Sequence, residues 1–108
     1  MYGNPQRLGA PETHELRREG GKWLKQLRED AGLSQRRLAD LVGAEYYTFI
    51  SQLESGRGRI PPDRYLLWAR SLKQDPREFV RELLRYYDPV THTILFGDSI
   101  GNRLPHNL

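Results

Sequence analysis

One segment of the chain combines a predicted buried stripe with a neutral, hydrogen-bonding face. Between Glu45 and Glu54, apolar side chains recur three and four residues apart, which predicts a helix. The apolar stripe consists of Tyr46, Phe49, Ile50 and Leu53, and the residues that point away from it are Tyr47, Thr48, Ser51, Gln52 and Ser55. A solvated helix face usually carries charged residues such as Lys and Glu. A face made of hydroxyl and amide groups instead predicts hydrogen bonds to a binding partner.

Basic residues lie on both sides of this segment, although the net charge of the chain is small. Seventeen Lys and Arg residues against fourteen Asp and Glu residues give a formal charge of +3, which is spread almost evenly along the 108 residues. Such a charge permits a polyanionic partner without requiring one. Arg57 and Arg59 follow the segment in a glycine-rich loop, and Arg36 and Arg37 precede it. The positions of the charges, rather than their sum, therefore favour a polyanion.

Other kinds of chemistry find no support in the residue types. The chain has no cysteine, which excludes disulfides, thiolate zinc sites and cysteine nucleophiles. His14, His92 and His106 are isolated from other metal-binding residues, so we expect ordinary packing or solvated histidines and no metal. Neither a catalytic triad nor a phosphate-binding glycine loop can be recognised, and we expect no enzymatic activity and no cofactor. No apolar run approaches the roughly 20 residues of a membrane span, and no signal-peptide pattern is visible, so we expect a cytoplasmic protein.

Five helices are expected to position the polar face and the basic residues. They cover about Gly21–Ala31, Gln35–Val42, Glu45–Glu54, Pro62–Leu72 and Pro76–Tyr87. Ser34 and Asp75 are predicted N-caps, and Gly32 and Gly43 are predicted to end the helices that they follow. The aromatic residues on the apolar stripes, which we expect in the core, are Trp23, Tyr65, Trp68 and Phe79.

The two ends of the chain differ from this helical centre. Residues 1–19 carry almost no apolar side chains and are expected to form a flexible arm, with at most a short helical turn at Pro11–Glu19. The segment Val90–Phe96 is rich in β-branched residues and roughly alternates in polarity, which predicts a strand. This strand is expected either to lie across the helices as an extended arm or to pair with the same segment of a second subunit. Residues 89–108 are therefore assigned to a C-terminal extended or β segment.

Several short motifs occur together in a recognisable order. They are Gly32-Leu33-Ser34-Gln35, Leu38-Ala39, Gly43 and Ile50-Ser51-Gln52-Leu53-Glu54-Ser55-Gly56. In this order they resemble the Cro/C1 (XRE) family of DNA-binding domains over about residues 20–73. The resemblance implies an all-α, five-helix, lambda-repressor-like fold within residues 20–88. It also implies that the helix at about Glu45–Glu54 lies in the major groove, usually in a dimer on a two-fold operator.

The resemblance further implies roles for individual residues. Tyr47, Thr48, Ser51 and Gln52 would contact bases, and Gln35 would contact a phosphate through its amide and the N-terminus of its helix. The basic residues beside the predicted recognition helix, Arg36, Arg57 and Arg59, are expected to add phosphate contacts. A glutamine amide can bond adenine, and a threonine methyl can contact thymine. Arg28 and Glu54 match two family positions that bridge the first and third helices, which implies a structural role. Ile50 follows Gly43 by seven positions where the family usually has six, so an extra residue lies in the turn or at the start of the helix, within Glu45–Tyr47.

These observations predict a sequence-specific transcriptional regulator that binds double-stranded DNA. We expect a homodimer in the cytoplasm of a bacterial or phage system, associated with the nucleoid when it is bound. The alternative is a protein-interaction module of an antitoxin-like kind, or one that binds a sigma factor or a partner regulator. In that alternative, Val90–Phe96 and the tyrosine-rich surfaces would contact the protein partner.

Overall fold

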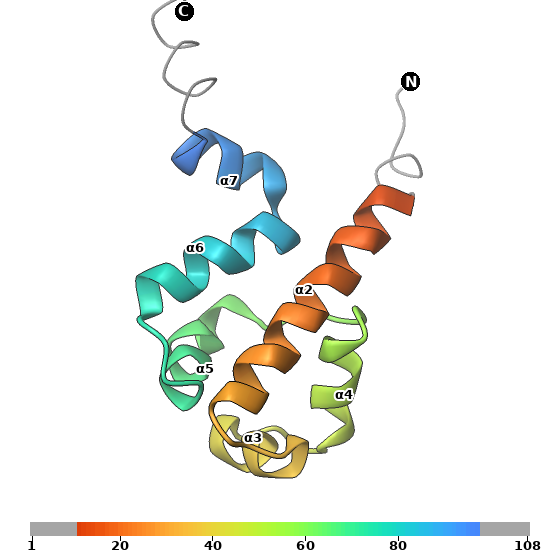
Figure 1. Ribbon diagram of the computed structural model, residues 1–108, viewed down its shortest axis with the longest axis vertical. Coiled ribbons are helices and arrows are strands. Elements are labelled where there is room, and N and C mark those ends of the chain that lie inside the picture. Colours follow the sequence, from red (N-terminus) through yellow and green to blue (C-terminus); the bar gives the residue numbers. More distant parts are fainter. Residues whose placement is uncertain (1–10, 98–108) are drawn as a thin grey trace, which may run out of the picture.

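The computed structural model describes residues 11–97 of the chain, and within this range every regular element is a helix (Figure 1). The elements are α2 (Pro11–Asp30), α3 (Gln35–Val42), α4 (Thr48–Glu54), the short 3-10 helix η1 (Pro62–Arg64), α5 (Tyr65–Ser71), α6 (Pro76–Tyr87) and α7 (Pro89–Phe96). The predicted all-α class is confirmed for these residues, with six α-helices rather than five. Residues 1–10 of the predicted arm and 98–108 of the predicted C-terminal segment lie outside the described part.

Helix α2 is longer than the sequence indicated, because it continues through two adjacent glycines. It begins at Pro11 rather than at Gly21, so the prediction of a flexible arm is wrong for residues 11–19. Gly20 and Gly21 are buried, and a Cβ atom at Gly20 would lie 2.7 Å from the Cβ of Tyr86. A Cβ atom at Gly21 would collide with the backbone carbonyl of Glu54. The glycines weaken the helix locally, but they let α4 and α6 pack directly against its backbone.

The helix-turn-helix unit is formed by α3 and α4. Helix α3 has the predicted bounds; the hydroxyl of Ser34 accepts a hydrogen bond from the backbone N–H of Arg37 at 3.0 Å, and Gly43 ends the helix with φ of 70°. Helix α4 begins only at Thr48, so the extra residue lies in the turn before it. As a result, the prediction that Tyr46 belongs to the buried stripe is wrong, and 67% of this residue is exposed.

The core lies where α2 through α6 meet. Its buried apolar residues are Leu24, Leu38, Ala39, Val42, Ile50, Leu53, Ile60, Trp68, Ala69, Leu72, Phe79, Leu83 and Tyr87. Trp23 stacks on Phe79 with a ring-centroid distance of 5.4 Å, and the Tyr87 hydroxyl accepts a hydrogen bond from the backbone N–H of Ile60 at 3.2 Å. Burial raises the pKa of this tyrosine. The four aromatic residues predicted for the core are buried or partly buried, as expected.

The C-terminal half differs from prediction mainly in its last helix. The expected helix Pro62–Leu72 is divided into η1 and α5, whereas α6 has the predicted bounds and its predicted cap at Asp75. The predicted strand Val90–Phe96 is wrong, because this segment belongs to α7. Asp88 caps α7 by accepting hydrogen bonds from the backbone N–H of Thr91 at 3.2 Å and from its hydroxyl at 2.7 Å, and these bonds lower the pKa of the carboxyl group.

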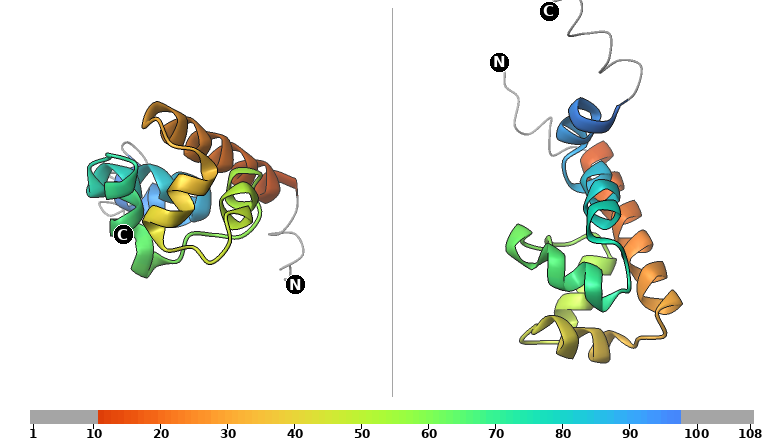
Figure 2. Two further views of the ribbon diagram at one scale, coloured as in Figure 1. Left: turned by 90° about the horizontal axis from the view of Figure 1, so that it is seen from below. Right: turned by 90° about the vertical axis from the view of Figure 1, so that its left-hand side faces the viewer.

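Helix α2 organises the arrangement of the other helices. It runs between α4 and α6, and α7 lies at the opposite end of the molecule from α3 (Figures 1 and 2). Helix α7 packs on α6 and buries none of its own residues. No described helix is both long enough and apolar enough to cross a membrane.

A buried ion pair joins α2 to α4. The guanidinium of Arg28 donates from Nε to Oε2 of Glu54 at 2.6 Å, from Nη2 to Oε1 at 3.1 Å and from Nη1 to the carbonyl of Leu33 at 2.8 Å. Only 9% of the arginine side chain and 6% of the glutamate side chain are exposed. The hydrogen bonds that Arg28 donates to Glu54 raise the pKa of the arginine. The structural role that the family resemblance implied for this pair is therefore confirmed.

Replacing Glu54 by Gln is expected to reduce the free energy of unfolding by about 3–5 kcal/mol, because the Arg28 charge stays buried without its counter-charge. Urea unfolding followed by circular dichroism measures this loss. Glu45→Gln is the matched control, since Glu45 is exposed and such surface changes stay within about 0.5 kcal/mol. Similar unfolding midpoints for the two variants would contradict the prediction.

Candidate nucleic-acid interface

The outward face of α4 is exposed and uncharged. Burial of Ile50 and Leu53 turns Thr48, Ser51 and Gln52 toward solvent, and all three are exposed. Ser55 continues this face, because it lies seven positions, or about two helical turns, after Thr48. The side chains of Thr48, Ser51 and Gln52 make no hydrogen bond to another described residue, so their hydroxyl and amide groups are available. The structure thus brings together three of the four predicted base-contacting residues on one surface.

Tyr47 and Arg36 form one unit at the start of this face. Tyr47 occupies the N-cap position of α4, and its ring is partly exposed. The Arg36 guanidinium lies 4.7 Å from the centre of that ring. Such a cation–π contact stabilises an exposed pair by about 0.5–1 kcal/mol. It holds a positive charge beside the first turn of α4, where sequence reasoning expected a phosphate contact from Arg36.

The side chain of Gln35 bonds to a residue within the domain, whereas its predicted role requires an amide that is free to contact a phosphate. Its amide nitrogen donates a hydrogen bond to Oε1 of Glu54 at 3.0 Å, so it joins the ion pair of Arg28. The side-chain donor is therefore engaged inside the domain. A phosphate contact at this position would have to come from backbone N–H groups in the first turn of α3, which helices leave without intrahelical partners.

The loop after α4 separates the two arginines that sequence reasoning treated alike. Gly56 and Gly58 adopt the left-handed conformation, with φ of 89° and 72°. Arg57 is exposed beside the end of α4. The guanidinium of Arg59 instead lies 4.8 Å from the centre of the Tyr87 ring, beside α6. The two arginines predicted to contact phosphates therefore have different surroundings: Arg57 is exposed beside α4, whereas the Arg59 guanidinium lies against an aromatic ring of α6.

Helix α2 contributes a basic residue at this loop that sequence reasoning missed. Arg17 donates a hydrogen bond from Nη1 to the carbonyl of Gly58 at 3.3 Å, and its guanidinium lies 5.3 Å from the centre of the Tyr87 ring. Burial and the nearby charge of Arg59 lower the pKa of Arg17. The proline at position 11, a favourable first helical residue, was the signal that could have extended α2 to include Arg17.

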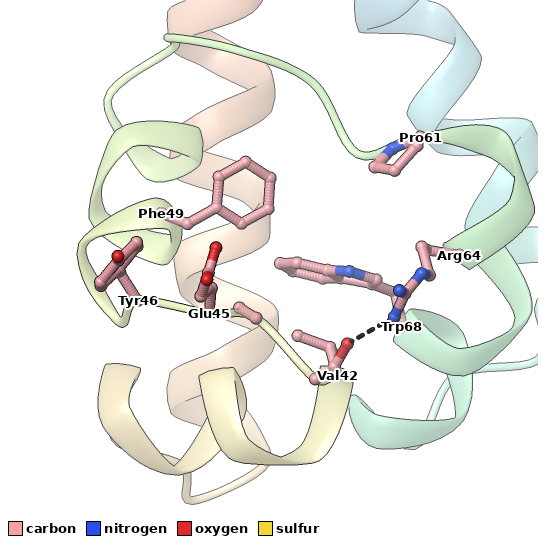
Figure 3. A pocket seen from close by; sticks show the side chains of 9 residues that line it. Val42, Glu45, Tyr46, Phe49, Pro61, Arg64 and Trp68 are labelled. Carbon is pink, nitrogen blue, oxygen red and sulfur yellow. Dashed lines mark hydrogen bonds between the residues drawn. The ribbon is translucent and has the colours of Figure 1, made fainter.

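A cavity of about 310 Å³ lies behind the turn between α3 and α4 (Figure 3). It is lined by Val42, Gly43, Ala44, Glu45, Tyr46, Phe49, Pro61, Arg64 and Trp68. Arg64 donates from Nη1 to the carbonyl of Val42 at 3.1 Å, which ties the end of α3 to η1. This bond supports the turn from which α4 starts. Among residues 11–97, no three His, Asp or Glu side chains are grouped to hold a metal ion.

Comparison with known proteins agrees with this geometry. A family model described as helix-turn-helix matches residues 24–79, from the second half of α2 to the start of α6. No curated protein matches the chain. The family implies DNA binding, and it is not known as a family of enzymes. Since the match covers just over half of the chain and includes both helices and the turn of the motif, the protein belongs to the helix-turn-helix family of the Cro/C1 (XRE) type.

Proposed function

We propose that the protein is a transcriptional regulator that binds specific double-stranded DNA sequences with α4 in the major groove. The observation that carries this proposal is the neutral, hydrogen-bonding face of α4, which has a positive charge at each end. Arg36 lies beside its start and Arg57 beside its end. Phosphates border the major groove on both sides, whereas the base edges lie between them. The distribution of charge around α4 fits this pattern.

The two groups of residues have separate tasks in this proposal. Thr48, Ser51 and Gln52 contact base edges, and Tyr47 contributes its ring at the edge of the same surface. Arg36, Arg57 and Arg59, with the N-terminus of α3 at Gln35, contact phosphates. The phosphate contacts supply most of the affinity, and the base contacts distinguish one sequence from another.

The protein is proposed to act as a homodimer on a two-fold operator. Helix α4 has seven residues and is therefore about 10 Å long, which limits the number of base pairs that one copy can contact. Two copies joined in one complex bind two half-sites with a much higher combined affinity. Half-sites separated by one turn of DNA, or a multiple of it, place both recognition helices on the same side of the duplex.

The exposed face of α7 is the proposed contact between the two copies. Helix α7 contains no charged residue, yet Val90, Ile94 and Leu95 are 69%, 69% and 61% exposed. Large apolar side chains that are exposed together on one helix are typical of an interaction surface. These three side chains, counted on both copies of a symmetric interface, would bury roughly 400–700 Å². The groove between α6 and α7 adds apolar surface toward the total of about 1,200 Å² at which specific interfaces begin.

Charge complementarity also favours a second copy of this chain. The groove of about 550 Å³ beside α7 is lined by Val80, Leu84 and Phe96, and at its rim by Arg77, Glu78 and Arg81. A rim that carries both signs of charge can pair with itself across a two-fold axis. The same apolar face is the observation that favours the alternative function, in which α7 binds a toxin, a sigma factor or another regulator.

Binding to duplex DNA is expected to depend steeply on salt. With three phosphate-binding arginines in each protomer, a dimer neutralises about six phosphates, and its affinity should fall by about a thousandfold between 50 and 200 mM salt. Fluorescence anisotropy with a labelled duplex, repeated at several salt concentrations, measures this dependence. Affinity that does not change over this range would contradict the proposed function.

Substitutions in the two groups of residues should have different effects. Gln52→Ala and Thr48→Ala are each expected to reduce the preference for the operator over a scrambled duplex by about 1–3 kcal/mol. Arg57→Ala should instead weaken binding to both duplexes alike and make the salt slope shallower by about 0.9 for each protomer. Titration of each variant with both duplexes separates the two effects. Identical behaviour of the two classes would show that the surfaces are wrongly assigned.

Introducing a charge into α7 should separate the two copies. Ile94→Asp is expected to convert the dimer into a monomer in analytical ultracentrifugation, whereas Leu66→Asp, at an exposed apolar residue of α5, should leave the dimer intact. Binding of the Ile94 variant to an isolated half-site should stay unchanged. A wild-type protein that is monomeric at micromolar concentrations would contradict the dimer, and deletion of residues 89–108 would then test for loss of a protein partner.

A further inference from the structure

The N-terminal half of α2 lies before the family-matched residues 24–79 and packs against the loop that follows α4 (Figure 1). A Cβ atom at Gly56 would lie 3.0 Å from the Cα of Arg18, so the loop backbone and the helix backbone are in close contact. Arg17 adds its hydrogen bond to the carbonyl of Gly58. This half of the helix is therefore part of the surface beside α4.

Four positive charges gather at this contact between helix and loop. They are Arg17, Arg18, Arg57 and Arg59. Arg17 and Arg59 both lie within 5.3 Å of the centre of the Tyr87 ring, so two cations share one aromatic side chain. In the described part of the chain, Glu15 is the one carboxylate that forms an ion pair with any of these arginines, and it pairs with Arg18 at 2.5 Å. Like charges repel one another, so a cluster of this kind is favourable for an anionic ligand.

A cavity joins this cluster to the outward face of α4. It has a volume of about 410 Å³ and is lined by His14, Arg18, Ser55, Gly56 and Arg57. Ser55 belongs to the same face as Thr48 and Gln52. A DNA strand that borders the major groove beside α4 would therefore pass the mouth of this cavity.

We propose that this cavity binds a phosphate group of the DNA backbone, with the guanidinium groups of Arg18 and Arg57 as its donors. This inference rests on the proposed function and extends the interface to the part of α2 that precedes the family-matched residues. A guanidinium presents several N–H groups in one plane and matches the oxygens of a phosphate. Two guanidinium groups from different elements surround the anion and fix its position relative to α4.

Glu15 acts as an internal competitor for this phosphate. Its carboxylate holds Arg18 in the unbound protein, with 55% and 56% of the two side chains exposed. An exposed ion pair of this kind contributes about 0–1 kcal/mol, so a backbone phosphate can replace the carboxylate. Arg57 has no corresponding carboxylate among the described residues.

The test compares the salt dependence of duplex binding among variants of the full chain. Arg18→Gln is expected to make the slope of log affinity against log salt shallower by about 0.9 for each protomer, equally for operator and scrambled duplexes. Arg18→Lys should retain the wild-type slope. Glu15→Gln should act in the opposite direction and tighten binding to both duplexes. Arg70→Gln is the matched control, because it removes one exposed positive charge on α5, and it should leave the slope unchanged.

Different outcomes test the phosphate site and the proposed function independently. If wild-type protein binds duplex DNA with a steep salt slope but Arg18→Gln has the same slope, the phosphate site is overturned and the proposed function stands. If Arg70→Gln changes the salt slope as much as Arg18→Gln does, the change comes from the loss of net charge alone, and the site is also overturned. The other source of the anion is free inorganic phosphate. Titration with inorganic phosphate at constant ionic strength, followed by NMR of the arginine side chains, tests whether it binds there. Binding of phosphate there at low millimolar concentration, with no effect of Arg18→Gln on duplex binding, would overturn a backbone contact.

Discussion

The ion pair between Arg28 and Glu54 is the interaction on which the rest of the helix-turn-helix unit depends. Two charges removed from water destabilise a fold unless each finds hydrogen-bond partners. Here the guanidinium bonds both carboxylate oxygens and the carbonyl of Leu33, and Gln35 adds a further donor to the carboxylate. The pair thus connects α2, the start of α3 and the last turn of α4 at one point. Helix α4 has no side-chain cap and only seven residues, so such external contacts must hold it in place.

Close backbone packing along α2 is the second constraint. The glycines at positions 20 and 21 leave no room for a Cβ atom between α2 and its neighbours α4 and α6. Glycine in a helix interior costs about 1 kcal/mol relative to alanine, and the packing that it permits must offset this loss. A rigid α2 then supports both the recognition surface and the loop that carries Arg57. The proposed base contacts and phosphate contacts are consequently fixed to the same helix.

The two proposed interaction surfaces, on α4 and on α7, lie in different parts of the molecule. Helix α4 lies on one side of α2, whereas α7 packs on α6 at the far end from α3 (Figure 1). The proposed association through α7 and the proposed attraction to DNA can therefore change independently. The net charge of +3 gives no sign of these separate surfaces, because acidic and basic residues nearly balance over the whole chain.

Sequence alone determined the elements whose signals are local. The bounds of α3 and α6 follow from capping residues and helical periodicity, and the exposure of Thr48, Ser51 and Gln52 follows from the spacing of their apolar neighbours. The family resemblance, which rests on short motifs in order, identified the bridge between the first and third helices of the motif. The helix bounds and the exposed face depend on residues within a few positions of one another, so periodicity and capping rules are sufficient for them. The bridge instead joins Arg28 to Glu54, which is 26 positions away, and it was inferred from the resemblance alone.

Tertiary structure decided the features that depend on distant contacts. The apolar periodicity that begins at Trp23 placed the helix start at Gly21, whereas α2 in fact continues through Gly20 and Gly21, which pack closely against α6 and α4. The β-branched residues after Pro89 favoured a strand, yet the cap at Asp88 and packing on α6 stabilise a helix. The surroundings of Gln35 and Arg59 likewise depend on partners 19 and 28 positions away, Glu54 and Tyr87. Local propensities differ by less than about 1 kcal/mol for most residues, so packing between distant segments outweighs them.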